Sequence, residues 1–548
     1  MKAQKLILGN IITLDENTPF ASAMTISNGR IQYVGSIEEA KVYCDENTVT
    51  LDYGNNYIYP GFMDAHTHGM FAGYRSLGQA NLASILPPNH DGYRQVIKKF
   101  IEDNPEKDIY IAAGWGEDGK TIFTSEFLDE ICNNKPLIMN TMSGHSILLN
   151  KKAIEYFGID EEYAKKYGTD LVRVDENGKP TGYICETPAI SIIQSLKINV
   201  EDAKKYILDW QNFAFSKGFV GAVDAGMELI SPSALDAYVS LNQDNKLKLY
   251  SYGYVICDDN LNDPAVKAKE ISDLANKYNN SHFKIIGAKV FLDGVVEAHT
   301  AWLDADYDDN PGYHGNERFN DIDKLSKLVA ETAKYNLSVH AHSDGDGATK
   351  FFLSAIEKGQ AISGNIDQRN AAAHLQLVCP QDFERMAKTK TVAVVAPLWV
   401  PKLPGVYEQE NKYIGKTRND SVYPIKSFID AGATIVFHSD YPISTIFEGP
   451  ASVYVAVTRT MPEGAYGMGG ELSARGKNEA ISRLQSLEAL TKNVAYMIHE
   501  EDNLGSISIN KIANITVLDK DLLNDDIEEV ITAKVISTIV DGEEVYHC

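Results

Sequence analysis

The sequence predicts an α/β protein built around a (β/α)8 TIM barrel, and three observations support this prediction. Eight apolar segments of strand length recur through the middle of the 548-residue chain. Segments with helical periodicity lie between most of them, which is typical of strands that run parallel. Histidine, lysine or aspartate ends five of the eight segments, and the functional residues of such barrels lie at the carboxyl ends of the strands.

The predicted barrel domain covers residues 58–484. Its eight predicted strands are residues 57–68, 219–223, 249–255, 283–291, 337–342, 371–374, 392–395 and 433–438. One predicted helix spans residues 321–335, with its apolar residues on one face behind a cap at Asn320 or Asp321. Another covers residues 423–431, and Gly432 is expected to end it.

Both ends of the chain consist of short strand-like segments. Residues 1–57 carry a hairpin signal at Asn28-Gly29, and residues 485–548 carry a turn signal at Asp541-Gly542. Neither end has enough strands to close a sandwich alone. The two ends together are therefore expected to form one small β-sandwich domain.

The interval between the first and second predicted barrel strands is too long for a single crossover helix. Residues of about 75–200 contain further strands, such as 110–114 and 136–139, and further helices. We expect an inserted α+β domain here, at a position that often carries a substrate lid.

Composition excludes several classes of protein. The net charge of −25 argues against nucleic acid and against an anionic membrane surface as partners. No segment approaches the ~18 uninterrupted apolar residues of a membrane helix, and the apolar run at the N-terminus is too short for a signal peptide. The six cysteines are scattered without a CxxC pair, which favours a reducing, cytoplasmic compartment. The expected partner is a small-molecule substrate, and assembly into a homo-oligomer is left open.

His66 and His68 end the first predicted barrel strand. Residues i and i+2 of a strand face the same side, so both imidazoles could bind one metal ion, and neutral imidazole is the commonest ligand for zinc. An isolated pair of this kind is as often two polar residues in a turn. Here four further strands also end in residues of this type, namely Lys289, His342, His374 and Asp440. So large an ordered set is hard to explain by chance.

With these motifs the chain resembles the metal-dependent amidohydrolase superfamily, and within it the amidohydrolase family 3 branch, which includes N-substituted formamide deformylase. The resemblance runs nearly end to end and rests on Pro60–His68, Gly287–Gly294, His342–Ala348, His374–Gln376, Ser439–Pro442 and Gly505–Ile515. The last segment has Asn510 where the family has glycine and Asn514 where it has aspartate. These two changes are expected to affect the β-domain rather than the site.

The resemblance implies a metal centre and a reaction. One or two divalent ions, usually zinc, would be held by His66, His68, Lys289, His342, His374 and Asp440. Lys289 would be carboxylated on its nitrogen so that it bridges two ions, and a single-metal site is the alternative if it is not. A water activated by the metal would attack an amide-type carbonyl, while Asp440 takes the proton and returns it to the leaving nitrogen.

Four other side chains are candidates for substrate contact. Trp115 and His145 lie in the insertion and resemble parts that this branch directs at its substrate. For His145, packing within the lid is the competing role. Glu297 and His299 follow the lysine strand and are predicted to line the pocket.

Three residues near the predicted ligands have open roles. His340 lies on the same strand face as His342, so either could bind the metal, and the resemblance favours His342. Asp346 either tunes the surroundings of the metal or stabilises a turn. His438 stands where the family often has a small residue, at the metal end of the last strand.

The expected function is hydrolysis of carbon–nitrogen bonds other than peptide bonds, in an amide of N-acyl or N-formyl type. Deamination or the opening of a cyclic amide on the same scaffold is the alternative, although deaminases of the superfamily commonly use one metal and lack the lysine. A regulatory protein without catalysis is a third hypothesis. Such a protein would be expected to lose ligands that this chain keeps.

Overall fold

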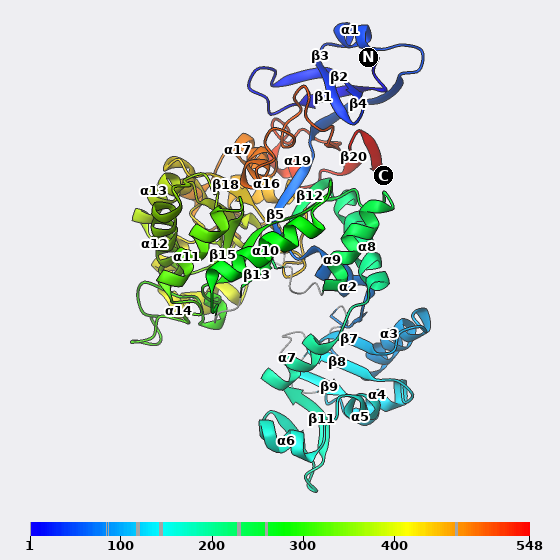
Figure 1. Cartoon of the computed structure of the whole chain (residues 1–548), viewed down its shortest axis with the longest axis vertical. Helices are drawn as coiled ribbons and strands as arrows, with labels where there is room; N and C mark the ends of the chain where they lie inside the picture. Colours follow the sequence, from blue (N-terminus) through cyan, green and yellow to red (C-terminus); the bar gives the residue numbers. More distant parts are fainter. Residues whose placement is uncertain are drawn as a thin grey trace. The chain divides into compact units, whose positions relative to one another are not determined.

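A computed structural model gives the architecture of the chain (Figure 1). It describes residues 2–83, 85, 87–116, 121–141, 146–226, 232–257, 261–465 and 469–548. The chain forms two compact units. The barrel unit comprises Met1–Gly69, Trp210–Leu229 and Tyr238–Cys548, and the insertion unit comprises Met70–Asp209 and Ile230–Ala237. Among the residues described, no helix has both the length and the apolar character that a membrane span requires.

Eight parallel strands form the sheet at the centre of the barrel unit, as the sequence predicts. In the order of the sheet they are β5 (Phe62–Thr67), β12 (Phe219–Asp224), β13 (Tyr250–Ile256), β14 (Phe283–Phe291), β15 (Ser338–Ser343), β16 (Ala371–His374), β17 (Val392–Val395) and β18 (Ile435–Phe437). Spatial order equals chain order throughout. Most residues of these strands are buried, because helices cover the outer face of such a barrel and side chains fill its interior.

The barrel closes just beyond the end of β18. The backbone N–H of Asp440 donates to the carbonyl of His66 at 3.0 Å, and the N–H of His68 donates to the carbonyl of Tyr441 at 2.8 Å. The Asp64 carboxylate accepts the N–H of Ser439 at 3.0 Å. These bonds hold the end of the last strand against the first, and so they bring two predicted ligand segments together.

Helices precede, separate and follow the later strands of the barrel along the chain (Figure 1). They are α8 (Val200–Ser216), α9 (Pro232–Gln243), α10 (Pro264–Tyr278), α11 (Ile322–Ala333), α12 (Asp346–Ser363), α13 (Pro380–Thr389), α14 (Val406–Asp420), α15 (Ile425–Asp430), α16 (Gly449–Thr458), α17 (Arg483–Ala489) and α18 (Lys492–Met497). The predicted cap of α11 is present, because the Asp321 carboxylate accepts the N–H of Lys324 at 3.0 Å.

Strands from both termini form a single seven-stranded sheet in the barrel unit. Its order is β21 (Glu543–His547), β20 (Val535–Val540), β19 (Ile515–Leu518), β4 (Val49–Pro60), β1 (Lys5–Ile12), β2 (Phe20–Ser27) and β3 (Arg30–Gly35). The twelve-residue β4 pairs with β1 and, through its last four residues, with β19. The structure thus joins the strands of the two ends, which were expected to form one small β-sandwich domain, into one hydrogen-bonded sheet.

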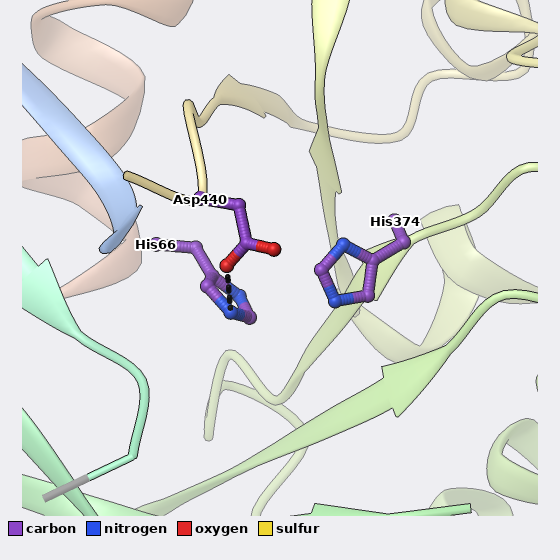
Figure 2. Close-up of side chains that lie close together, drawn as sticks. All are labelled: His66, His374 and Asp440. Atoms are coloured by element: carbon purple, nitrogen blue, oxygen red, sulfur yellow. Dashed lines mark ion pairs between the residues drawn. The ribbon is translucent and has the colours of Figure 1, made fainter. Parts of the chain in front are cut away.

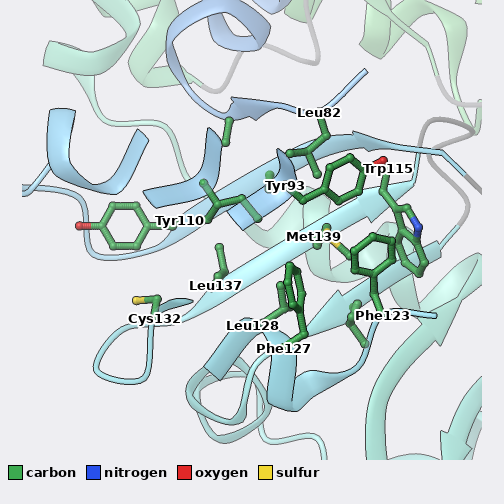
Figure 3. Close-up of a cluster of buried hydrophobic side chains, with 14 residues drawn as sticks. Leu82, Tyr93, Tyr110, Trp115, Phe123, Phe127, Leu128, Cys132, Leu137 and Met139 are labelled. Atoms are coloured by element: carbon green, nitrogen blue, oxygen red, sulfur yellow. The ribbon is translucent and has the colours of Figure 1, made fainter. Parts of the chain in front are cut away.

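The insertion unit has its own sheet and its own core. The sheet order is β10 (Val172–Val174), β11 (Pro180–Cys185), β9 (Ser146–Leu149), β8 (Leu137–Thr141), β7 (Tyr110–Trp115) and β6 (Ala80–Asn81). Its helices are α2 (Gly69–Leu77), α3 (His90–Asp103), α4 (Ser125–Ile131), α5 (Lys151–Tyr156), α6 (Glu161–Tyr167) and α7 (Glu186–Ser195). Figure 3 shows one aromatic-rich core of this unit, in which the Tyr93 and Phe123 rings stack with centroids 4.9 Å apart.

Two glycines of the quoted motifs permit close approaches near the barrel mouth. A Cβ atom on Gly287 of β14 would lie 2.0 Å from the carbonyl oxygen of Ser338 on β15. A Cβ atom on Gly345, before α12, would lie 2.0 Å from the carbonyl oxygen of Trp302. Only glycine fits at these positions, and both contacts lie beside strands that carry predicted ligands.

Candidate metal centre

The first strand and the segment after the last strand meet at Asp440. Its Oδ1 atom lies 3.3 Å from Nε2 of His66 (Figure 2). The same oxygen lies 3.2 Å from Nε2 of His68. Both histidines can reach the same oxygen because residues i and i+2 of β5 face the barrel interior together. The barrel closure described above fixes the backbone of all three residues.

His374 completes a compact set with His66 and Asp440. One potential ligand atom from each of these three buried residues lies within 4.8 Å of the others (Figure 2). His374 and Asp440 have positive φ values of 80° and 58°, which residues other than glycine adopt infrequently. Such conformations persist only where the surrounding structure enforces them, and they concentrate at functional sites. The Trp399 and His374 rings stack with their centroids 5.4 Å apart, and this contact helps to hold the imidazole in place.

Lys289 lies inside the barrel with no partner for its charge. It is 1% exposed, and its Nζ atom has no hydrogen-bond partner among the described residues. Its ammonium lies 5.0 Å from the centre of the Phe291 ring. Burial lowers the pKa of Lys289 to about 7, although the charges of Asp440 and Asp293 oppose this shift. A large fraction of the amine is therefore neutral near physiological pH.

His342 is oriented by a carboxylate. Its Nδ1 atom lies 2.9 Å from Oδ1 of Asp293, which follows β14. Asp293 also accepts the backbone N–H groups of Asp344 and Gly345, so it is fixed in place. This contact leaves Nε2 of His342 as the nitrogen available to a metal, which is a common arrangement around metal-binding histidines. The His342 and His374 rings are 4.5 Å apart.

Two further histidines lie within the same buried region. Nε2 of His340 lies 2.9 Å from Nδ1 of His66, so His340 contacts a predicted ligand while His342 contacts Asp293. The His438 ring lies 5.1 Å from His66, and neither of its nitrogens has a hydrogen-bond partner in the described part of the chain. In the sequence, His340 lies two residues before His342, and His438 lies two residues before Asp440. This spacing indicated that each histidine could lie near a predicted ligand.

Electrostatics keep these side chains in the forms that bind cations. Burial holds the pKa of His66, His340 and His374 well below the usual 6.5, so the imidazoles are neutral. Burial by itself would raise the pKa of Asp440, but the hydrogen bond with His68 and the nearby histidines outweigh it and hold that pKa below its usual range. Asp440 is therefore a carboxylate.

The donor set fits a divalent metal ion. Several buried polar atoms have no hydrogen-bond partner among the described residues: Lys289 Nζ, Nδ1 of His68, His340 and His374, and both nitrogens of His438. Buried polar atoms are normally paired because leaving them unpaired is costly. Neutral imidazole and carboxylate are zinc ligands, so a cation at this point would satisfy part of the set.

The structure describes three of the four candidate substrate residues. Trp115 ends β7 and packs in the insertion core, with its ring 5.7 Å from that of Phe123. His145 lies outside the described residues. His299 lies 2.9 Å from Asp309, and its ring is 3.7 Å from that of Tyr413.

Glu297 lies in a short 3-10 turn (Val296–Ala298) after β14. Burial, together with the charge of Glu410, raises its pKa, although Arg475 opposes this. Its contact with substrate remains a proposal.

Sequence reasoning did not single out three residues that shape the site. Asp64 accepts the backbone N–H groups of His66 and Ser439, and burial raises its pKa to about 7. Asp293 orients His342, and Trp399 stacks on His374. Both aspartates lie within the motifs quoted above. Asp64 precedes His66 by two residues, and Asp293 follows the end of β14 by two residues, so this spacing could have identified them. Trp399 carried no such signal.

Comparisons with known proteins identify the family of this chain. The sequence pattern of the amidohydrolase family matches residues 49–546. The protein LONG AFTER FAR-RED 3 of Arabidopsis thaliana is 25% identical over 553 residues, which covers 98% of this chain and 90% of that protein. The N-substituted formamide deformylase of Arthrobacter pascens is 24% identical over 561 residues, covering 99% of this chain and 98% of the deformylase.

A solved structure shows the same fold. The crystal structure of an uncharacterized metal-dependent hydrolase from Pyrococcus furiosus superposes with a TM-score of 0.76 at 23% identity, covering 95% of this chain and 100% of that one. The match of the family pattern spans nearly the whole sequence. The chain therefore belongs to the amidohydrolase family and is an enzyme that hydrolyses carbon–nitrogen bonds.

Proposed function

We propose that this amidohydrolase cleaves an amide-type bond other than a peptide bond, of N-acyl or N-formyl type, at a divalent metal centre, with zinc as the expected metal. The observation that carries the proposal is the convergence of His66, His374 and Asp440 within 4.8 Å inside the barrel. The likeness to a formamide deformylase along nearly its whole length supports the same class of substrate.

We assign the metal to the six side chains that the sequence predicts as ligands. His66, His68 and Asp440 would hold one ion, His342 and His374 would hold a second, and carboxylated Lys289 would supply oxygen ligands. When bound, such ions lower the pKa of a coordinated water and polarise a carbonyl oxygen. Burial excludes bulk water, which strengthens these electrostatic effects.

Asp440 is the general base and then the general acid in this proposal. Its carboxylate is ionised and faces two histidines of the first strand. It takes the proton of the attacking water as a bond forms to the carbonyl carbon, and it gives that proton to the nitrogen as the carbon–nitrogen bond breaks. The products are a carboxylic acid and an amine, so the atoms balance.

Lys289 is suited to carboxylation on its nitrogen. A neutral amine attacks carbon dioxide, a nitrogen–carbon bond forms and one proton is released, which turns a poor cationic ligand into an anionic oxygen ligand. The reaction requires the amine form, and a pKa of about 7 makes that form abundant above neutrality. The burial that lowers the pKa of Lys289 therefore prepares the side chain for this modification.

Carboxylation of Lys289 is expected to depend steeply on pH. In metal-free protein incubated with the same concentration of 13C-bicarbonate at each pH, the carbamate resonance in the 13C spectrum should be roughly tenfold stronger at pH 8 than at pH 6, because the neutral fraction of an amine with a pKa of about 7 changes by that factor. The signal should be absent in a Lys289→Ala variant. Equal signals at both pH values, or none at pH 8, would contradict the assignment.

The alternatives differ in what they require of Lys289. A deaminase of this superfamily commonly works with one metal and has no lysine at this position, and a regulatory protein has no need of any ligand. The chain keeps Lys289 and all the other predicted ligands in its sequence, and Lys289, His66, His374 and Asp440 are buried. This favours amide hydrolysis over both.

Metal analysis tests the proposal directly. The purified protein is expected to hold about two ions per chain and to hydrolyse some members of a panel of N-acyl and N-formyl amines. Lys289→Ala should hold fewer ions and lose at least about 100-fold in kcat/KM. Lys284→Ala is the matched control, because Lys284 lies on the same strand but pairs with Glu500 at the partly exposed end of β14. A protein that stays metal-free and inactive on the whole panel after zinc addition would sink the proposal.

A further inference from the structure

His340 makes a contact that the assigned metal ligands do not explain. It lies on β15 directly opposite Lys289 of β14 and is fully buried. Its Nε2 atom lies 2.9 Å from Nδ1 of His66. The Tyr254 ring packs against the His340 imidazole at 4.8 Å, so the ring has a fixed place. The contact therefore joins a predicted ligand on the first strand to a non-ligand histidine on the fifth.

We propose that His340 is a positioning residue for His66. Its Nε2 accepts the Nδ1–H of His66 and so keeps Nε2 of His66 unprotonated and aimed at the metal position beside Asp440. This inference rests on the proposed metal centre, because it assigns His340 a role through the ligand His66.

The proposed contact with His340 determines which nitrogen of His66 carries the proton. A neutral imidazole carries one proton on one of its two nitrogens, and only the bare nitrogen can bind a metal. Nε2 of His66 faces Asp440, so the proton must be on Nδ1 when a metal is bound. Among the described residues, His340 Nε2 is the side-chain acceptor that Nδ1 reaches. Without it, a buried N–H would lose its partner, and the opposite tautomer would become more favourable.

His342 has an orienting partner of a different kind. Asp293 holds Nδ1 of His342 with a carboxylate at 2.9 Å, whereas His340 holds Nδ1 of His66 with an imidazole. The His340 imidazole is fully buried and can accept through an unprotonated Nε2. The two proposed ligands are thus oriented by one charged and one neutral acceptor, which places the extra negative charge on the side of His342.

Zinc affinity tests the role of His340 without reference to turnover. The full-length protein is stripped of metal, and zinc is titrated in competition with a chromophoric chelator. His340→Leu and His340→Phe remove the acceptor and should weaken the zinc affinity about 10- to 100-fold. His340→Gln keeps an acceptor oxygen and should restore the affinity to within about threefold of the wild type.

Tyr254→Phe is the matched control for packing. It changes the neighbour of His340 by one hydroxyl, which bonds to Ser338, and leaves the contact with His66 in place. Its zinc affinity should equal that of the wild type. The proposal is overturned if the folded His340→Leu and His340→Phe variants bind zinc as tightly as the wild type, or if His340→Gln loses as much affinity as they do. Failure of the wild type to bind zinc would instead overturn the proposed metal centre.

Discussion

Replacing Asp440 with asparagine is expected to lower kcat by a factor of about 10²–10⁴, the usual contribution of a general acid–base group. The amide has the shape of the carboxylate but cannot take a proton from water or return one to the leaving nitrogen. The carboxylate also lies within 3.3 Å of His66 and His68, so a weaker metal affinity should accompany the loss. Steady-state kinetics with zinc in excess separate the two effects, because saturation with zinc restores binding but not proton transfer.

Asp346→Asn is the control for this prediction. Asp346 also lies at the carboxyl end of a barrel strand, but its carboxylate accepts the backbone N–H groups of Asp304 and Gly347. The structure thus supports the structural role of Asp346 over a role near the metal. Its variant should keep kcat within about threefold of the wild type, since an amide oxygen can accept the same bonds. Equal losses in both variants would mean that the Asp440 result reflects general damage to this face of the barrel.

The barrel strands could be predicted closely from the sequence because parallel strands are buried on both faces. Residues 283–291 and 392–395 were predicted as strands, and β14 and β17 have these bounds. A continuous apolar run is a strong signal in this setting. The two termini were predicted to share one β-domain, but the order and pairing of their strands were not, because these depend on the length and register of β4, which pairs with strands from both ends.

The departures from the family pattern at the C-terminus affect the β-domain, as expected. Asn510, in place of glycine, has a φ of 72°, a conformation that asparagine tolerates better than most residues. The side-chain oxygen of Asn514, in place of aspartate, accepts the N–H of Asp541 at 2.9 Å. Asn510 meets the backbone requirement of its position, and Asn514 keeps an acceptor oxygen while its buried Nδ2 has no hydrogen-bond partner among the described residues.

The contacts between candidate site residues could not be predicted in the same way. Spacing indicated that His340 and His342 share a face, but it did not show that one contacts His66 and the other Asp293. Those contacts depend on rotamers and on the irregular segment after β14, and neither leaves a periodic pattern. Trp399 is a stronger example, because a short turn after β17 brings its ring onto His374. Chain order places the predicted ligands at the barrel mouth. Packing determines which nitrogen of each histidine faces the centre of the barrel.

Arg475→Met is expected to destabilise the barrel unit by about 3–5 kcal/mol, the cost of removing one partner of a buried ion pair. The guanidinium lies 2.6 Å from Glu410 of α14, and the two side chains are 3% and 2% exposed. Arg475 also donates to the carbonyl of Asn419 at 2.8 Å. Without it, the Glu410 carboxylate stays buried, and among the described residues the side-chain N–H of Gln376 is its remaining hydrogen-bond partner. Urea unfolding followed by tryptophan fluorescence measures the shift of the main transition.

A double variant separates the charge from the packing. Arg475→Met with Glu410→Gln removes both charges and should recover much of the stability, because the cost lies in the unpaired carboxylate and not in the missing contact. Lys426→Met is the surface control and should change stability by less than about 0.5 kcal/mol, because its pair with Asp430 is exposed. A double variant no more stable than Arg475→Met would assign the loss to packing. Gln376 follows His374 by two residues, so a recovery of stability without recovery of zinc affinity would show that this buried pair also holds the sixth-strand ligand in place.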